Sequence, residues 1–143
     1  MLATLKHDPA LFDPAVFDQA LAAEPSELKV FKQALKQGNQ HLVNLFEQNE
    51  SITSLVTERA WFIDQLLLSA WDLKIRGREL SLIAAGGYGR GELHPASDID
   101  LMILLPSSIN PVIKTRIEDF LRFLWDIGLE VGHSVRTVKD CVQ

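Results

Sequence analysis

Two aspartates, Asp98 and Asp100, stand one residue apart at the head of an apolar run that continues to Leu105. Alternate residues of a β-strand point to the same face, so both carboxylates are expected on one side of a strand over 98–105, about 7 Å apart along the backbone. Two carboxylates on one face repel each other unless a cation lies between them. Mg²⁺ suits this arrangement, because it binds one or two carboxylates together with substrate phosphates.

A cluster of glycines precedes the aspartates: Gly86, Gly87, Gly89 and Gly91. The cluster follows a short apolar run over 80–85 that predicts a buried strand, so we expect a tight turn whose N–H groups face an anion. The spacing of Gly86 and Gly91 fits a P-loop, but Glu92-Leu93 follows where Lys and Ser or Thr are required, and the dinucleotide-binding fingerprint also fails. The turn predicts phosphate binding of another kind.

The order strand, Gly-Gly turn, then Ser97-Asp98-Ile99-Asp100 on a second strand is similar to the signature of the nucleotidyltransferase superfamily. Two longer segments resemble the amino-terminal catalytic domain of the bifunctional PII uridylyltransferase family: Gly86-Gly-Tyr-Gly-Arg-Gly-Glu-Leu93 and Trp125-Asp-Ile-Gly-Leu-Glu-Val-Gly-His-Ser-Val-Arg-Thr137. The resemblance covers residues 80–137. The glutamine synthetase adenylyltransferases share the Ser-Asp-x-Asp core but differ in the glycine turn, so they rank second.

The resemblance implies transfer of UMP from UTP to a tyrosine of the trimeric PII protein in nitrogen regulation, with release of pyrophosphate and with Mg²⁺ as cofactor. By position, Gly86 and Gly87 would hold the triphosphate, and Asp98 and Asp100 would bind Mg²⁺. The alternative is a non-catalytic nucleotide-binding or interaction module of the same fold. Spacing alone does not indicate which base is recognised.

Two further polar residues near the glycine turn suit phosphate binding on chemical grounds. Arg90 can pair with phosphate charge, and Ser97 can donate a hydrogen bond to a phosphate oxygen. Each also has a structural explanation, since Arg90 can pair with Glu92 and Ser97 can cap the turn before the strand. Both interpretations stay open at this stage.

The superfamily implies a third carboxylate, on a neighbouring strand, that binds a second ion and activates the attacking hydroxyl. Residues 129–138 alternate as a third strand, in which Glu130 is the only acidic residue. Period-two alternation puts it on one face with Gly132, Ser134 and Arg136. Glu130 is therefore a candidate, and the alternative is a carboxylate beyond the present sequence.

The family's other activities belong to domains with no counterpart here. Removal of UMP uses a metal-dependent HD phosphohydrolase domain, and glutamine sensing uses ACT domains. His7-Asp8 is the only His-Asp pair, and it is explained as a helix cap. We therefore expect a transferase fragment without hydrolase activity or glutamine regulation.

Hydrophobic periodicity predicts the elements that position these residues, and hence an α+β fold. A helical amino-terminal region over 1–77 is followed by a nucleotidyltransferase domain over 78–143, the start of a mixed β-sheet flanked by helices that the chain leaves incomplete. Gly38 is a possible bend in the second helix. The predicted helices begin at Asp8-Pro9 and at Pro25-Ser26 and then cover 51–76 and 111–127, and the predicted strands cover 80–85, 98–105 and 129–138.

Composition limits the class of protein further. The chain has 143 residues and a net charge of −5, which argues against binding nucleic acid by charge alone. No apolar run is long enough to span a membrane, and the first residues lack a signal-peptide core. The one cysteine, Cys141, excludes a disulfide framework and fits the reducing cytoplasm.

Overall fold

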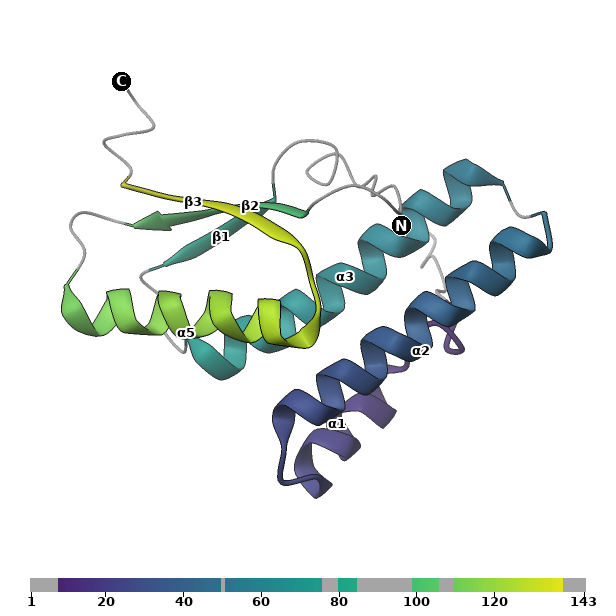
Figure 1. The fold of residues 1–143 in the computed structure, drawn as a ribbon, viewed down its shortest axis with the longest axis horizontal. Helices are drawn as coiled ribbons and strands as arrows, with labels where there is room; N and C mark the ends of the chain where they lie inside the picture. Colours follow the sequence, from purple (N-terminus) through teal and green to yellow (C-terminus); the bar gives the residue numbers. More distant parts are fainter. Residues whose placement is uncertain (1–7, 50, 76–79, 85–98, 106–109, 138–143) are drawn as a thin grey trace, which may run out of the picture.

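The computed structural model describes residues 8–49, 51–75, 80–84, 99–105 and 110–137 of the chain. Within these ranges four helices and three strands form an α+β fold, as predicted. Figure 1 shows α3 and α5 on one side of the sheet, with α1 and α2 farther from it. In chain order the elements are α1 (Pro14–Ala23), α2 (Glu27–Glu47), α3 (Ile52–Lys74), β1 (Ser81–Ala84), β2 (Ile99–Leu105), α5 (Pro111–Ile127) and β3 (Val131–Thr137).

The first helix begins later than the sequence predicts. Asp8 does cap a turn, because its Oδ1 accepts a hydrogen bond from the Ala10 N–H at 2.9 Å. The helix itself starts at Pro14, where Asp13 caps it by accepting a hydrogen bond from the Ala15 N–H at 3.0 Å. Two Asp-Pro pairs thus satisfy the same capping rule, and the earlier one makes only a turn.

The second helix, α2, runs through Gly38 without the bend that the sequence left open. A Cβ atom at Gly38 would overlap the ring of Phe62, which is fully buried on α3. The glycine therefore permits close approach of α2 and α3 and does not break the helix.

Helix α5 has the predicted bounds and connects two parallel strands. Asn110 caps its start by accepting a hydrogen bond from the Ile113 N–H at 2.9 Å. At the other end, Gly128 takes a left-handed φ of 112°, and the Leu129 N–H donates to the Leu124 carbonyl at 3.1 Å. This is a Schellman termination, which favours glycine at the left-handed position.

The sheet is mixed and has the order β1-β2-β3. Strand β1 pairs antiparallel with β2, and β2 pairs parallel with β3 through the α5 crossover. The strands are slightly shorter than predicted where the structure describes their ends, since Leu80 precedes β1 and residues 129–130 precede β3. A parallel neighbour requires such a crossover, so α5 determines how β3 meets β2.

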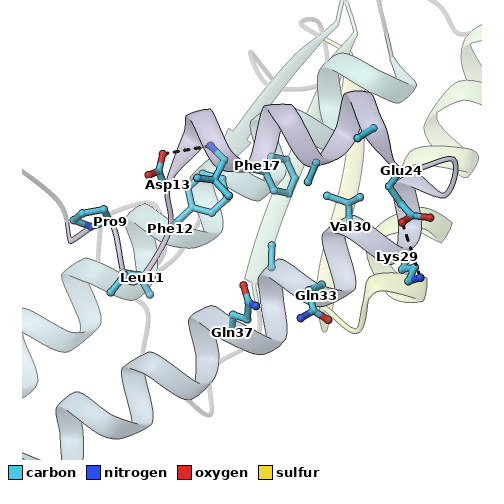
Figure 2. Close-up of a pocket in the computed structure, with 15 residues that line it drawn as sticks. Pro9, Leu11, Phe12, Asp13, Phe17, Glu24, Lys29, Val30, Gln33 and Gln37 are labelled. Atoms are coloured by element: carbon cyan, nitrogen blue, oxygen red, sulfur yellow. Dashed lines mark hydrogen bonds and ion pairs between the residues drawn. The ribbon is translucent and has the colours of Figure 1, made fainter.

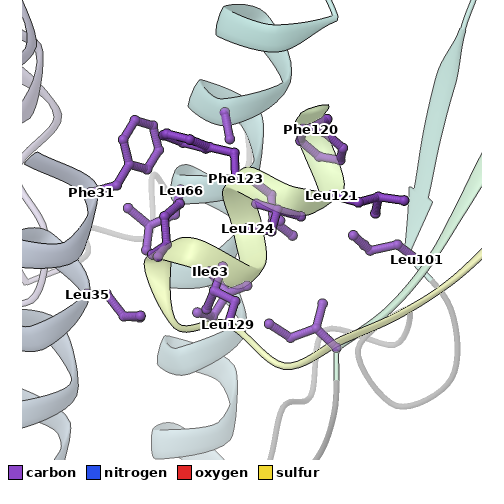
Figure 3. Close-up of a cluster of buried hydrophobic side chains, with 14 of the residues drawn as sticks. Phe31, Leu35, Ile63, Leu66, Leu101, Phe120, Leu121, Phe123, Leu124 and Leu129 are labelled. Carbon is purple, nitrogen blue, oxygen red and sulfur yellow. The ribbon is translucent and has the colours of Figure 1, made fainter. Parts of the chain in front are cut away.

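Alternation along β2 directs one set of side chains into the core, as predicted. Ile99, Leu101, Ile103 and Leu105 are buried, whereas Asp100 is exposed. Figure 3 shows Leu101 of β2 beside helix α5. Helix α5 also lies beside Phe31 of α2 and Ile63 of α3. One hydrophobic core thus joins the helices and the sheet. The predicted boundary at Gly77 falls within residues 76–79, outside the described ranges.

None of the helices in the described ranges is both long enough and apolar enough to cross a membrane.

Candidate functional site

Two of the residues predicted for the site, Asp100 and Glu130, lie in the described part of the chain. The remaining candidates fall outside the described ranges: Gly86, Gly87, Arg90, Ser97 and Asp98. The geometry of the site is therefore built around Asp100, with β2 and β3 as its frame.

Asp100 is the second residue of β2 and projects from the face opposite to the described helices. No hydrogen-bond or ion-pair partner of its carboxylate is found among the described residues. The register places Gly132 of β3 directly opposite. A Cβ atom at Gly132 would lie 3.1 Å from Asp100 Oδ1, so the space beside the carboxylate exists because this residue has no side chain.

The face that carries Asp100 continues along both strands. The register pairs Met102 with Ser134 and Leu104 with Arg136. Residues that pair directly across two strands share a face. Ser134 and Arg136 therefore share one face of β3 with Gly132, as the alternation predicts, and the register puts that face on the same side of the sheet as Asp100. Arg136 adds an exposed cation four residues along from Gly132.

Glu130 lies immediately before β3 and not within it, which corrects the predicted start of the strand at 129. Its side chain is exposed, and its carbonyl accepts a hydrogen bond from the Ile99 N–H at 3.0 Å. Ile99 is the residue that follows Asp98 in the chain. This hydrogen bond fixes the start of β3 beside the start of β2.

Two carboxylates lie near the starts of β2 and β3. Asp100 is the second residue of β2, Glu130 comes immediately before β3, and both side chains are exposed. Their negative charge suits this end of the sheet to a cation, and a phosphate group would need that cation in order to bind here.

The carboxylate of Asp100 suits a hard divalent cation, but this one side chain does not make a complete metal site. Carboxylate oxygens are the ligands that Mg²⁺ prefers, and the space over Gly132 leaves one oxygen of Asp100 accessible. No group of three or more His, Cys, Asp or Glu side chains is close enough to hold a metal ion within the described ranges. Asp98, the other predicted ligand, lies outside them.

His133 belongs to the opposite face of β3. Its ring lies 6.0 Å from that of Trp125 on α5, centroid to centroid. The Trp125 Nε1–H donates to the Val131 carbonyl at 3.5 Å, which holds the indole along the strand. His133 therefore lies beside Trp125 with its own side chain exposed, and it does not share the face of Asp100.

A separate cavity of about 550 Å³ lies between the amino-terminal turn, α1 and α2. Figure 2 shows Phe12, Phe17 and Val30 around it, with the Glu24–Lys29 ion pair, at 3.9 Å, near one end. The lining is mainly apolar, and none of the candidate site residues belongs to it. This cavity is not part of the carboxylate site.

Gly132 is the residue at this site that sequence reasoning did not single out. It appeared only as a neighbour of Glu130 on one face. The signal was available, because an isolated glycine inside a strand often marks a close approach by another group.

Comparison with known proteins adds a family match over the same elements. Residues 63–137 match the family described as "Nucleotidyltransferase domain", a range that includes the whole described sheet. The match contains both Asp100 and Glu130.

Similar bacterial proteins carry the name bifunctional uridylyltransferase/uridylyl-removing enzyme. The protein of Stutzerimonas stutzeri strain A1501 is 48% identical over 136 residues, 94% of this chain and 15% of that protein. That of Pseudomonas syringae pv. tomato is 49% identical over 138 residues, 95% of this chain and 15% of that protein. That of Azotobacter vinelandii is 46% identical over 138 residues, with the same coverage. The chain thus spans about 15% of the length of these relatives.

Proposed function

The chain belongs to the nucleotidyltransferase domain family, and from this membership we propose that it is a uridylyltransferase module that transfers UMP from UTP to a tyrosine of the PII signalling protein. The transferase class is supported by the family match and by the names of the relatives. The choice of UTP, of PII and of Mg²⁺ is our proposal. So is a cytoplasmic location, which the single cysteine favours.

The observation that supports this proposal most is the exposed Asp100 carboxylate above Gly132. It is an oxygen donor on the face opposite to the described helices, and the exposed Glu130 adds negative charge at the same end of the sheet. In the proposed site Asp98 and Asp100 hold Mg²⁺, and Gly86 and Gly87 hold the triphosphate. Arg90 and Ser97 contact phosphate oxygens. The metal supplies positive charge that offsets the phosphates.

The chain's own residues then mainly position the reactants. Glu130 is the proposed third carboxylate and would accept the proton of the attacking tyrosine hydroxyl. The tyrosine oxygen bonds to the α-phosphorus of UTP as the bond to pyrophosphate breaks, so UMP is transferred and pyrophosphate leaves. Holding the hydroxyl and the phosphate in line lowers the barrier mostly through orientation and charge neutralisation.

The first experiment measures UTP binding by calorimetry with and without Mg²⁺. We expect the double variant Asp98→Asn with Asp100→Asn to lose metal-dependent binding, because an amide is a poor ligand for this cation. Asp18→Asn with Asp72→Asn is the matched control, since it removes the same charge from exposed positions on α1 and α3. Metal-dependent affinity that is unchanged in the Asp98, Asp100 variant would contradict the proposal.

A second experiment tests the transfer itself. The chain is incubated with UTP, Mg²⁺ and PII, and mass spectrometry is used to look for PII that has gained UMP on a tyrosine. Nucleotide binding without transfer would instead support a non-catalytic nucleotide-binding module. Stronger competition by ATP than by UTP would indicate an adenylyltransferase of the type that acts on glutamine synthetase.

A further inference from the structure

We propose that Gly132 is a positioning residue for Asp100: because it has no side chain, it keeps open the space that the carboxylate needs in order to take a divalent cation. This inference rests on the proposed function and adds a residue to the same site. It concerns β3, a strand that supplies no predicted metal ligand within its own bounds.

The contact that supports the inference lies across the parallel pair of strands. Gly132 is opposite Asp100 in the register, and Asp100 Oδ1 is the one described atom within 4 Å of a Cβ built at Gly132. The separation of 3.1 Å is tighter than ordinary van der Waals contact. An added methyl group would therefore move the carboxylate by a few tenths of an ångström or turn it to another rotamer.

The backbone gives no other reason for a glycine at this position. The described glycine with a positive φ is Gly128, not Gly132. Glycine weakens a strand interior, since it costs conformational entropy and contributes no packing. A residue with a side chain would therefore stabilise β3 more than glycine does. Glycine at position 132 makes the strand less stable but leaves space beside Asp100.

The other two described glycines differ, because each has a structural explanation. Gly128 ends α5 in a left-handed conformation, and Gly38 makes room for the buried ring of Phe62. The group beside Gly132 is an exposed carboxylate with no partner found in the described ranges. The space at Gly132 thus serves a polar group on the surface and no part of the core.

The test uses Mn²⁺ as a probe that electron paramagnetic resonance detects, titrated into the chain in the presence of UTP. We expect Gly132→Ala to weaken Mn²⁺ binding about tenfold, the usual scale when a residue that orients a metal ligand is changed. Thermal unfolding without metal should occur at the same or a higher temperature, since alanine suits the strand better. A residue that only supported the fold would lower both quantities together.

Ser134→Thr is the matched control. It adds one methyl group to the same face of the same strand, two residues along, where the partner is Met102 instead of Asp100. We expect its Mn²⁺ affinity to equal that of the unaltered chain. Equal weakening in both variants would overturn the inference, because the effect would then come from added bulk on the face in general.

A double-mutant cycle provides a readout without metal. In the Asp100→Ala background, Gly132→Ala meets no carboxylate, so it should raise the unfolding temperature more than it does in the unaltered chain. Equal shifts in the two backgrounds would overturn the inference. So would a Gly132→Ala chain that does not fold, since neither the backbone nor any apolar neighbour explains such a loss.

The two proposals fail in different ways. If Asp100→Asn abolishes Mn²⁺ binding while Gly132→Ala leaves it unchanged, the positioning role is wrong and the proposed function stands. If Asp100→Asn leaves Mn²⁺ binding unchanged, Asp100 is not a ligand, and both proposals are wrong.

Discussion

Asp8 shows how one exposed carboxylate can organise the chain before α1. Its Oδ1 accepts the Ala10 N–H, and its Oδ2 lies 2.7 Å from Nε2 of His41 on α2. The backbone hydrogen bond and then the contact with His41 hold the pKa of Asp8 below its ordinary value of 3.8. The residue thus caps a turn, where a helix cap was predicted, and also ties that turn to α2, a contact between residues 33 apart that no local pattern indicates.

The lowered pKa of Asp8 determines the sign of its effect on stability. A carboxyl group with a lowered folded pKa stabilises the protein above its unfolded pKa, here 3.8, and that contribution is lost as the pH falls through the lower folded pKa. We expect Asp8→Asn to reduce the free energy of unfolding above pH 3.8 by at most about 1 kcal/mol, as for exposed ion pairs. The difference from the unaltered chain should shrink at lower pH.

Thermal unfolding over a series of pH values measures this difference. Asp18→Asn is the control, because Asp18 is an exposed aspartate on α1 with no partner recorded in the described ranges. A difference between Asp8→Asn and the unaltered chain that stayed constant at acidic pH would show that the charge of Asp8 is not responsible.

At the site, sequence reasoning could place Asp100 on a face but could not find its neighbour. Period-two alternation alone puts Asp100 opposite the buried residues of β2, and the structure confirms this. The opposition of Asp100 and Gly132 depends on the register of two strands joined by a helix. That register is determined by how α5 packs on the sheet, which no short stretch of sequence encodes.

At the scale of the element, the contact between α2 and α3 depends on Gly38. Alanine would raise helix propensity by about 1 kcal/mol. However, its Cβ would overlap the buried Phe62 ring, and overpacking of a core costs about 1 to 3 kcal/mol. We expect the clash to prevail, so that Gly38→Ala lowers the free energy of unfolding in urea.

A compensating change identifies the cause. Combining Gly38→Ala with Phe62→Leu should cost less than the sum of the two single variants, because the smaller side chain makes room for the methyl group. If Gly38→Ala alone were more stable than the unaltered chain, the two helices would not approach as closely as the structure shows.

The bounds of a helix could be predicted from the sequence where a single capping site was available at each end. Asn110 before Pro111 and Gly128 after Ile127 bracket α5, and both bounds agree with the structure. The predicted start of the first helix, at Asp8-Pro9, was wrong because Asp8 and Asp13 both precede a proline. Local capping rules accept either site, and the amphipathic packing of the helix selects the second.

At the scale of the whole molecule, aromatic rings connect the helical region with the helix that covers the sheet. Phe17 of α1 lies 5.0 Å from Phe31 of α2, and Phe31 lies 4.9 Å from Phe123 of α5, between ring centroids. Figure 3 shows Phe31 beside Phe123. These contacts make the helices and the sheet depend on one another for stability.

We therefore expect Phe31→Ala to destabilise helices and sheet together, by about 3 to 5 kcal/mol, the usual cost of removing a buried phenylalanine. Far-UV circular dichroism and tryptophan fluorescence should report one common transition at a lower denaturant concentration. Phe46→Ala, at an exposed position on the same helix, is the control and should change little. Separate transitions for the two signals would contradict a shared core.

The link between α5 and β3, which begins at Gly128, also limits where the chain can gain or lose a residue. Three residues separate α5 from β3, and the second of them, Leu129, is anchored in the core. Deleting or inserting one residue here would shift β3 by one residue and turn each of its side chains to the other face of the sheet. His133 or Val131 would then lie opposite Asp100 in place of Gly132. The number of residues in this link is therefore expected to stay constant among related sequences.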